Sequence, residues 1–234
     1  LRRSFGDVVA VDGVDLSVPR GAVLGLLGPD GAGKSTLIRM LATVLRPDAG
    51  DARVQGYSVT RQANRVTPRI GYMSQKFALY PDLSVAENIE FFARLRGVAK
   101  AERRARSLEL LTGIGLADFL GRQAGRLSGG MKQKLFLATT LMHRPDVLLL
   151  DEPTTGVDPV SRREFWAILG RLLEEKGVTA LVSTAYLDEA DRFHRVSLFH
   201  EGKVMGEGTP AELVAVVPGT LALFRAEPQA DALP

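Results

Sequence analysis

The sequence contains no cysteine among its 234 residues, and this absence removes several kinds of chemistry at once. Without thiols the chain can form no disulfide framework, no thiolate zinc site and no cysteine nucleophile. Aromatic residues make up only 6% of the sequence, and no apolar run reaches the roughly 18 residues that a membrane-spanning helix needs. We therefore expect neither a spanning helix nor a secretion signal in this sequence.

An excess of charge of one sign is also missing, because 30 lysine and arginine residues stand against 27 aspartate and glutamate residues. The net charge of +3 is small and dispersed, which predicts a solvated surface and no nucleic-acid partner. A hydrophobic share of 45% is ordinary for a globular domain and excludes disorder and fibrous folds. The chain starts at Leu1 and closes on AEPQADALP, so we expect it to be a segment of a longer protein.

Three apolar segments are typical of buried strands: residues 22–27 (AVLGLL), 146–150 (DVLLL) and 178–184 (VTALVST). Strands of this kind indicate a parallel sheet that is covered on both faces. The helix-like PVSRREFWAILGRLLEEKG joins the second segment to the third and has Gly177 as its natural end. The alternating residues 1–18 predict an antiparallel strand pair beside this sheet.

A long polar and helical stretch separates the first two strands and predicts an inserted helical lobe. Within it, Ser84 and Glu87 have the spacing of a capping box at the start of a helix. Ile89, Phe92 and Leu95 follow on one helical stripe, which predicts that this face packs into the lobe. The predicted fold class is therefore α/β, with a parallel-sheet core, an antiparallel β patch and a helical insertion.

The segment GPDGAGKS, residues 28–35, satisfies the pattern G-x-x-x-x-G-K-[ST] between a predicted strand and a predicted helix. Its glycines let backbone N–H groups turn inward around phosphate oxygens, and the helix N-terminus adds partial positive charge. Lys34 then neutralises the β- and γ-phosphates, and the Ser35 hydroxyl is a ligand for Mg²⁺. An ordinary glycine turn is the alternative, which the flanking strand and helix disfavour. The motif predicts a P-loop NTPase core that binds ATP and Mg²⁺.

Two carboxylates, Asp151 and Glu152, follow the second apolar segment. They come to the carboxyl edge of the predicted sheet, where ligands of open α/β folds bind. We interpret Asp151 as a partner of Mg²⁺ and Glu152 as the group that polarises the attacking water. Alone, an Asp-Glu pair after a strand would indicate a solvated turn or a helix cap. Together with the phosphate loop, the pair predicts ATP hydrolysis.

The stretch RLSGGMKQKLFLATTLMHRPDVLLLDEPTTGVDP resembles the nucleotide-binding domain of ATP-binding cassette (ABC) transporters, and the resemblance covers nearly the whole chain. Residues 127–131 (LSGGM) are similar to the signature loop of that family. There, Ser128 and two glycines open a second helix N-terminus that suits an anion. The resemblance implies a head-to-tail dimer in which each ATP lies between Lys34 of one subunit and Ser128 of the other.

Further roles are implied by the resemblance at single positions. Phe5 falls where the family places an aromatic residue that stacks on adenine, with a core phenylalanine as the alternative. Gln75 resembles the glutamine that contacts Mg²⁺ and the attacking water, and Asp158 resembles the loop that signals between the two sites. Phe77, Leu79 and Tyr80 resemble a groove wall that receives a helix from transmembrane permease subunits, although isolated surface apolar residues need no partner.

The predicted site residues fall into three groups. Nucleotide contacts are expected from Phe5, Gly28, Pro29, Asp30, Gly31, Ala32, Gly33, Lys34, Ser35, Thr36, Leu127, Ser128, Gly129, Gly130 and Asp158, catalytic roles from Glu152 and Gln75, and Mg²⁺ ligation from Ser35, Gln75 and Asp151. The resemblance implies a single ABC ATPase domain. Residues 1–75 and 145–217 form a RecA-like core with the β patch, residues 76–144 the helical lobe, and residues 218–234 a C-terminal tail.

Three positions depart from the family's pattern. Asp30 stands where asparagine is more usual, and its side chain is expected to point away because the loop holds phosphate through its backbone. Met131 replaces the signature glutamine and resembles exporters of the ABC-2 subgroup. Ala185 stands where the family places a histidine that bonds the γ-phosphate, which alanine cannot do. The 3 histidines of the chain, at positions 143, 194 and 200, are interpreted as surface or turn residues.

The sequence therefore predicts the ATP-hydrolysing subunit of an ABC transporter, similar to ABC-2 exporters and located on the cytoplasmic face of the cell membrane. Its own site is expected to turn over slowly because of Ala185, as in the first cassette of a fused two-cassette protein or in an engineered ATP trap. The second cassette is expected from a homodimer, a heterodimer or the same chain. Two alternatives stay open: a soluble tandem cassette that remodels an assembly such as the ribosome, and a regulatory ATP sensor without turnover.

Overall fold

A computed structural model of the chain describes residues 1–216, apart from the side chains of Glu175, Lys176 and Val216. The predicted tail, residues 218–234, lies outside the described residues. The main sheet has six strands in the order β10-β9-β3-β8-β7-β6. These strands are β3 (Val23–Leu27), β6 (Ile70–Met73), β7 (Val147–Asp151), β8 (Thr179–Thr184), β9 (Arg195–His200) and β10 (Lys203–Gly208). Neighbouring strands are parallel except for β9 and β10, which confirms the predicted parallel core.

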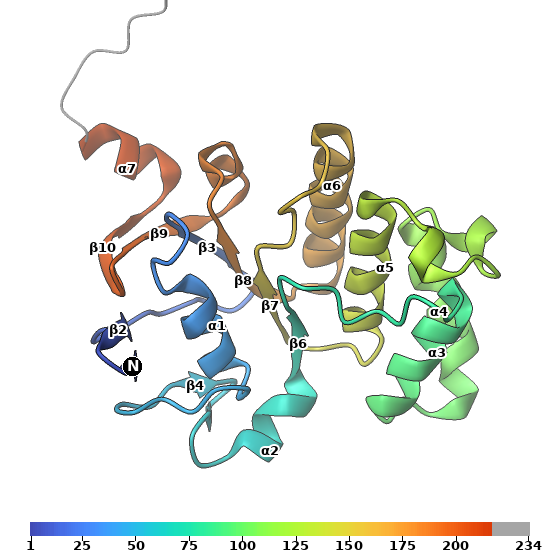
Figure 1. The fold of residues 1–234 in the computed structure, drawn as a ribbon, viewed down its shortest axis with the longest axis horizontal. Helices are drawn as coiled ribbons and strands as arrows, with labels where there is room; N and C mark the ends of the chain where they lie inside the picture. The colour runs from blue at the N-terminus through green and yellow to red at the C-terminus, as the bar shows by residue number, and fades with distance from the viewer. Residues whose placement is uncertain (217–234) are drawn as a thin grey trace, which may run out of the picture.

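The helices include the predicted insertion, because α3, α4 and α5 lie between β6 and β7 in the chain. They are α1 (Lys34–Leu41), α2 (Ala63–Val66), α3 (Val85–Leu95), α4 (Lys100–Gly113), α5 (Gly129–Leu141), α6 (Pro159–Lys176) and α7 (Pro210–Val216), with 3-10 helices at Thr67–Arg69, Ala117–Phe119, Ala124–Arg126 and Leu187–Arg192. Figure 1 shows α3 and α4 at one end of the long axis, with β10 and α7 at the other. Helix α6 ends at Gly177, φ 59°, as predicted. Every helix within residues 1–216 is too short or too polar to cross a lipid bilayer.

The sheet is covered on both faces, as its apolar strands predict. All five residues of β3 are buried, and successive residues point to opposite faces. Leu24 and Leu26 pack in a cluster with residues of α1, whereas Val23 and Leu27 pack in a second cluster with residues of α5 and α6. The strand that ends at the phosphate loop is therefore fixed from both sides.

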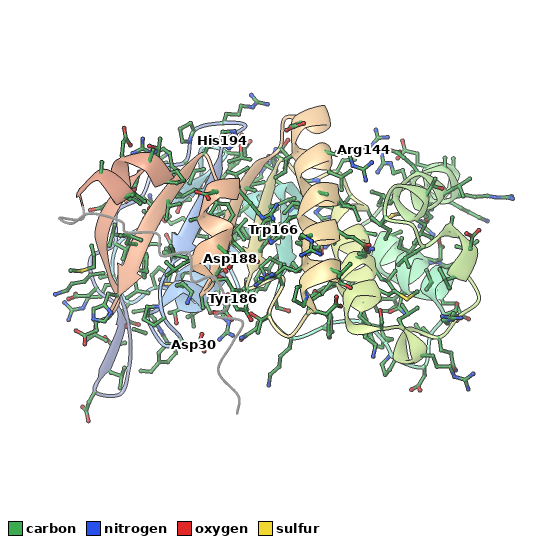
Figure 2. All side chains as sticks on the ribbon, turned by 90° about the horizontal axis from the view of Figure 1, so that it is seen from above. Asp30, Arg144, Trp166, Tyr186, Asp188 and His194 are labelled. Atoms are coloured by element: carbon green, nitrogen blue, oxygen red, sulfur yellow. The ribbon has the colours of Figure 1, made fainter. Side chains whose placement is uncertain are left out.

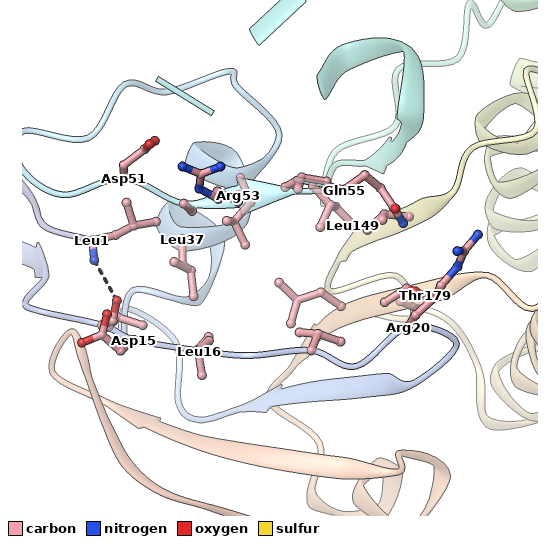
Figure 3. A pocket seen from close by; sticks show the side chains of 18 residues that line it. Leu1, Asp15, Leu16, Arg20, Leu37, Asp51, Arg53, Gln55, Leu149 and Thr179 are labelled. Atoms are coloured by element: carbon pink, nitrogen blue, oxygen red, sulfur yellow. Dashed lines mark hydrogen bonds between the residues drawn. The ribbon is translucent and has the colours of Figure 1, made fainter. Parts of the chain in front are cut away.

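The antiparallel patch is shorter than predicted. It consists of the pairs β1 (Arg3–Phe5) with β2 (Val8–Val11) and β4 (Arg53–Val54) with β5 (Tyr57–Ser58). The Leu1 amino group donates to the Val14 carbonyl oxygen at 2.7 Å (Figure 3), and the Val14 N–H donates back to Leu1 at 3.0 Å. The prediction of strand structure as far as residue 18 was wrong. Among residues 1–216, no strand forms backbone hydrogen bonds with residues 15–18.

A cavity of about 620 Å³ lies beside this segment (Figure 3). Its lining includes Val147 and Thr179, the first residues of β7 and β8, together with Leu16 and Leu37. Ligands of open α/β sheets bind at the carboxyl ends of the strands. The cavity is therefore at the opposite edge of the sheet from the phosphate loop.

Helix α3 begins as predicted, and only its last residue departs from the predicted stripe. The Glu87 N–H donates to Ser84 Oγ at 3.2 Å and the Ser84 N–H donates to Glu87 Oε2 at 2.8 Å, which confirms the capping box. Ile89 is buried, but Leu95 is 66% exposed, so the predicted stripe was wrong at that position. Asn88 is buried because its side-chain amide donates to three backbone carbonyls, at 3.0–3.1 Å.

Candidate nucleotide-binding site

The phosphate loop connects the buried end of β3 to the start of α1. Gly33, with φ 104°, precedes the helix, and no side chain caps it. A Cβ at Gly33 would clash with the carbonyl oxygen of Ala10, and one at Gly28 with that of Phe199. Packing against β2 and β9 therefore requires these glycines independently of any phosphate. The Asp30 side chain is exposed at the edge of the molecule (Figure 2), as expected for a group directed away from the loop.

Lys34 lies inside this loop with 3% of its side chain exposed. Its Nζ donates to the carbonyl oxygens of Gly28 at 2.8 Å and Pro29 at 2.9 Å, and lies 3.5 Å from Glu152 Oε1. The ammonium group is thereby fixed beside the uncapped start of α1. The positive charge and the helix dipole both favour an anion at this point.

Asp151 is fully buried at the end of β7. Its Oδ1 accepts hydrogen bonds from the hydroxyl groups of Ser35, at 2.7 Å, and Ser183, at 2.9 Å. Its Oδ2 is buried and has no hydrogen-bond partner in the part of the chain that the structure describes. A buried carboxylate oxygen left open beside a hydroxyl group fits a hard cation such as Mg²⁺, which takes oxygen ligands.

Glu152 lies between the phosphate loop and the loop that follows β6. Its N–H donates to Ser183 Oγ at 2.9 Å, and its backbone has φ 49°. Its Oε2 accepts from Gln75 Nε2 at 2.9 Å and from Thr155 Oγ1 at 3.2 Å, while Oε1 faces Lys34. The predicted cation, carboxylates and glutamine thus form one connected group at the carboxyl edge of the sheet.

Sequence reasoning missed Ser183 and Thr155, although both belong to this group. Ser183 connects Asp151 to the backbone of Glu152, and Thr155 donates to the Glu152 carboxylate. A signal was present, because a hydroxyl residue at the end of an apolar strand, or just after one, lies at the edge where ligands bind.

Ala185 follows β8 directly, is exposed and brings no polar side chain to the site. The predicted surface or turn positions agree with the structure, because His143 lies in the turn after α5 and His194 is exposed at the bend before β9. His143 Nε2 lies 2.9 Å from the carbonyl oxygen of Ile70, and His194 Nδ1 accepts from the Val23 N–H at 3.0 Å. Both bonds are made at amino ends of strands, away from Glu152. The third histidine ends β9 and is exposed. None of them takes the place that Ala185 leaves without a polar group.

The signature loop opens α5 and packs against the start of α6. Ser128 is the N-cap, and its hydroxyl accepts from the Met131 N–H at 3.3 Å. A Cβ at Gly130 would meet the side chain of Ser161 at 2.5 Å, whereas one at Gly129 would meet no atom within 4 Å. Gly129 is thus the open position of this loop. Leu127, just before the cap, is buried.

Asp158 caps α6 in the same manner. Its carboxylate accepts from the N–H groups of Ser161 at 2.9 Å and Val160 at 3.1 Å. Hydrogen bonds from Ser161 first, and then from Val160, hold the pKa of Asp158 below its usual value. The side chain that the resemblance assigns to signalling thus also fixes the start of a helix.

Phe5 is not a core residue, because 49% of it is exposed on β1. The guanidinium group of Arg3 lies 4.9 Å from the centre of its ring. Strand β2, the partner of β1, touches the phosphate loop through Ala10 and Gly33. The hairpin that carries Phe5 therefore adjoins the candidate phosphate site.

Within the molecule, the signature loop is separate from the residues around the phosphate loop. Among residues 1–216, no hydrogen bond or ion pair connects Ser128 or Asp158 to Lys34 or Glu152. Figure 1 shows α1 and α5 at different positions along the long axis. The chain therefore carries two separate helix N-termini suited to anions. These features define a P-loop nucleotide-binding domain of the ATPase class.

The chain belongs to the ABC transporter family, whose model matches residues 11–155. The probable multidrug ABC transporter ATP-binding protein YbhF of Escherichia coli K12 is 48% identical over 213 residues, which cover 91% of this chain and 37% of YbhF. The daunorubicin/doxorubicin resistance ATP-binding protein DrrA of Streptomyces peucetius is 47% identical over 214 residues, covering 91% of this chain and 64% of DrrA. The Nod factor export ATP-binding protein I of Paraburkholderia xenovorans is 41% identical, covering 92% of this chain and 71% of that protein.

Solved structures agree with this assignment. The dimeric ATP-binding cassette MJ0796, bound to ADP and Pi, has a TM-score of 0.79 at 27% identity and covers 89% of this chain and 94% of its own. The subunit cbiO1 of Clostridium perfringens, part of the ABC transporter complex cbiONQ, has a TM-score of 0.83 at 29% identity and covers 92% of this chain and 88% of its own. The chain spans about a third of YbhF and less than two thirds of DrrA.

Proposed function

We propose that this chain is the ATP-binding and ATP-hydrolysing part of an ABC exporter, and that it works in a head-to-tail dimer with transmembrane permease subunits. The observation that carries the proposal is the connected group of Lys34, Gln75 and Glu152, with Ser35 bonded to Asp151 beside it. A cation next to an uncapped helix start, with a carboxylate beyond it, suits transfer of a phosphoryl group to water. The names of YbhF, DrrA and the Nod factor protein support export.

Glu152 is proposed to orient the attacking water. Its Oε2 is occupied by hydrogen bonds from Gln75 and Thr155. Its Oε1 accepts no hydrogen bond among the described residues and is the atom left to accept one from water. Lys34 and the amides of residues 28–36 are proposed to hold the phosphates.

Mg²⁺ is proposed to be held by Ser35 Oγ, Asp151 and Gln75. The unpartnered Oδ2 of Asp151 supports this assignment, as does the amide of Gln75, whose nitrogen is already used so that its oxygen is free to face a cation. When bound, the ion would neutralise charge on the transferred phosphoryl group.

The second half of each site is proposed to come from another cassette. Ser128, Gly129 and Gly130 would receive the phosphates held by a partner's Lys34, and Asp158 would lie between the two sites. Phe5 would stack on adenine. The separation of the two anion-suited helix starts within one chain supports this arrangement, as does the dimeric form of MJ0796. The partner is a second copy, a different cassette or a further cassette of the same protein.

Exposed aromatic residues after Gln75 are proposed to meet the permease. Phe77 is 43% exposed, Tyr80 46% and Phe91 37%, and the rings of Tyr80 and Phe91 lie 4.7 Å apart. Such a cluster on a helical lobe suits an apolar helix of a partner. This contact would hold the chain on the inner face of the cell membrane.

We divide the chain into a core, residues 1–75 and 145–217, and a lobe, residues 76–144. The loops after β6 and before β7 support these limits. The lobe shares its hydrophobic cluster with the sheet, since Val85 of α3 and Leu148 of β7 belong to the same cluster. We therefore propose that the two parts belong to a single domain.

Slow turnover is proposed for the chain's own site because Ala185 supplies no contact to phosphate. The same observation favours a second candidate function, a regulatory ATP sensor that binds nucleotide without hydrolysis. Steady-state ATP hydrolysis separates the two candidates. Ala185→His is expected to raise turnover by about 10-fold or more, since a single well-placed transition-state contact is worth about 10²–10³ in rate.

The blank in this experiment is Lys34→Ala, which should neither bind nor hydrolyse ATP. An unmodified chain that already turns over at the rate of Ala185→His would remove the proposal of a slow site. ATP binding without hydrolysis, in both the unmodified chain and Ala185→His, would favour the sensor.

A further inference from the structure

Glu189 is a buried acidic residue outside the connected group of Lys34, Gln75, Asp151 and Glu152. It lies in the 3-10 helix Leu187–Arg192 after β8, and 1% of it is exposed. Its carboxyl group accepts three hydrogen bonds, all from neutral donors. A buried carboxyl group of this kind needs its partners because an unmet acceptor inside the protein is costly.

The three donors come from three different elements. Glu189 Oε1 accepts from Thr154 Oγ1 at 2.7 Å and from Trp166 Nε1 at 2.8 Å, and Oε2 accepts from Thr184 Oγ1 at 2.6 Å. Thr154 belongs to the turn after β7, Trp166 to α6 and Thr184 to the end of β8. Figure 2 shows Trp166 on α6 and Tyr186 in the neighbouring segment. One carboxyl group therefore joins all three elements.

Two of these donors adjoin the groups that position Glu152. Thr154 precedes Thr155, whose hydroxyl group donates to Glu152 Oε2 at 3.2 Å. Thr184 follows Ser183, whose hydroxyl group accepts from the Glu152 N–H at 2.9 Å. Both chain segments that set the place of Glu152 are thus anchored on the same buried carboxyl group.

The same carboxyl group fixes the backbone on either side of Ala185. Thr184 Oγ1 accepts from the Tyr186 N–H at 3.0 Å, and the Glu189 N–H donates to the Tyr186 carbonyl oxygen at 3.3 Å. Ala185 has no polar side chain with which to hold this segment. Its position relative to Glu152 therefore depends on these bonds.

We infer that Glu189 is a positioning residue for ATP hydrolysis. It holds the turn that carries Glu152 in register with residues 183–186. The inference rests on the proposed ATPase function and adds to it a residue that acts through Glu152. A displacement of the catalytic group by a fraction of an ångström would lower the rate of the chemical step without changing nucleotide binding.

The test is Glu189→Gln, which keeps the volume of the side chain but accepts hydrogen bonds at one end only. Because Trp166 Nε1 can only donate, the amide oxygen must take the place of Oε1, and the Thr184 hydroxyl group then faces an N–H group to which it cannot donate. We expect kcat to fall about 10-fold while the Kd for ATP changes by less than about 2-fold. The matched control is Trp166→Phe, which removes one donor from the same oxygen but leaves both threonine bonds. It should lower the Tm and keep kcat within about 2-fold of the starting chain.

Two further comparisons separate positioning from a general loss of structure. Thr184→Val should reproduce the fall in kcat. Thr184→Ser, which keeps the hydroxyl group, should leave kcat close to that of the starting chain. In a Glu152→Gln background, Glu189→Gln should cause no further loss, because the group through which it acts is already gone.

Each comparison is made in the unmodified chain and in Ala185→His, so that a slow starting rate does not hide the effect. An unchanged kcat in Glu189→Gln, or an equal fall of kcat in Trp166→Phe, would overturn this inference and leave the proposed ATPase function standing. Absence of turnover in both backgrounds would overturn the proposed ATPase function and this inference with it.

Discussion

The backbone at Glu152 is held at φ 49°, where a residue other than glycine costs about 1–3 kcal/mol. Its N–H donates to the hydroxyl group of Ser183 at 2.9 Å and to the Ser183 carbonyl oxygen at 3.2 Å, and these bonds offset part of that cost. The side chain then lies between Lys34 and Gln75. At the scale of single residues, local strain is accepted where it places a carboxylate beside a cation and an amide.

Ser183 should therefore matter to both stability and turnover. In Ser183→Ala, Asp151 loses one of two hydrogen bonds and the Glu152 N–H keeps only the long bond to a carbonyl oxygen. We expect the free energy of unfolding to fall by about 1–3 kcal/mol and kcat to fall about 10-fold. Urea unfolding and steady-state hydrolysis measure the two effects.

The matched control for this variant is Ser197→Ala on β9. Ser197 is equally buried, and its hydroxyl group donates to Glu207 at 3.1 Å, away from the candidate site. It should show a similar loss of stability with unchanged turnover. Equal losses of turnover in the two variants would contradict the placement of Glu152 by Ser183.

Asp51 gives the stability of the chain a dependence on acid pH. Burial raises its pKa, but hydrogen bonds from Ser58 and Thr60 and the charge of Arg61 outweigh this and lower the pKa from 3.8 to about 2. Because the folded pKa is the lower one, the stabilisation is fully present above about pH 4 and is lost as the pH falls toward 2. Asp51→Asn should flatten the curve of unfolding free energy against pH in this window. Parallel curves for the two chains, measured by urea unfolding at each pH, would contradict this assignment.

Helix starts organise the candidate site at the scale of elements. Helix α1 has no side-chain cap, so its first N–H groups are available to phosphate. Helix α5 is capped by Ser128, which takes only the N–H of Met131 and leaves those of Gly129 and Gly130 for an anion. Helix α6 is capped by Asp158, and a carboxylate at that position disfavours an anion. The caps therefore distinguish two helix starts that suit an anion from one that does not.

The two glycines of the signature loop should respond differently to alanine. Gly129→Ala places its Cβ in open space and removes the helix cost of glycine, so the unfolding free energy should stay equal or rise by up to about 1 kcal/mol. Gly130→Ala drives its Cβ against Ser161 and should cost about 1–3 kcal/mol. Turnover in Gly129→Ala should nevertheless fall about 10-fold or more, because the added methyl group would meet the partner's nucleotide. Unchanged turnover in this stable variant would contradict the role of the loop.

Features that depend on residues close together in the sequence were predicted better than features that depend on distant contacts. The phosphate loop and the capping box of α3 follow from residues next to one another in the sequence. The strand predicted as far as residue 18 failed because pairing needs a distant partner, and Leu95 is exposed at the last residue of α3. Ser183 and Glu189 were missed for the same reason, since their partners lie 32 and 35 positions away.

The proposed nucleotide site consists of two halves that do not meet among residues 1–216. The residues around the phosphate loop lie at the carboxyl ends of β3, β7 and β8, and the signature loop opens α5 in the helical lobe (Figure 1). If a second molecule turned head to tail supplies the missing half, each dimer has two equivalent sites, and each site is built from both chains. A single chain should then bind ATP by itself. Hydrolysis should appear only at protein concentrations at which the chain forms dimers.

Mixing two inactive variants tests this arrangement, in an Ala185→His background that raises the rate. Lys34→Ala removes the phosphate side of one chain's site, and Ser128→Glu blocks the signature side with a negative charge. Each variant alone should be inactive, yet a mixed dimer retains one site with Lys34 from one chain and Ser128 from the other. Random pairing should restore about a quarter of the full rate, because half of the dimers are mixed and one of their two sites is intact. A chain with both substitutions, mixed with the active chain, forms mixed dimers without any intact site. This second mixture should also reach about a quarter of the full rate, from the dimers that pair two active chains. If each chain completed its own site, the first mixture would stay inactive and the second would reach about half of the full rate.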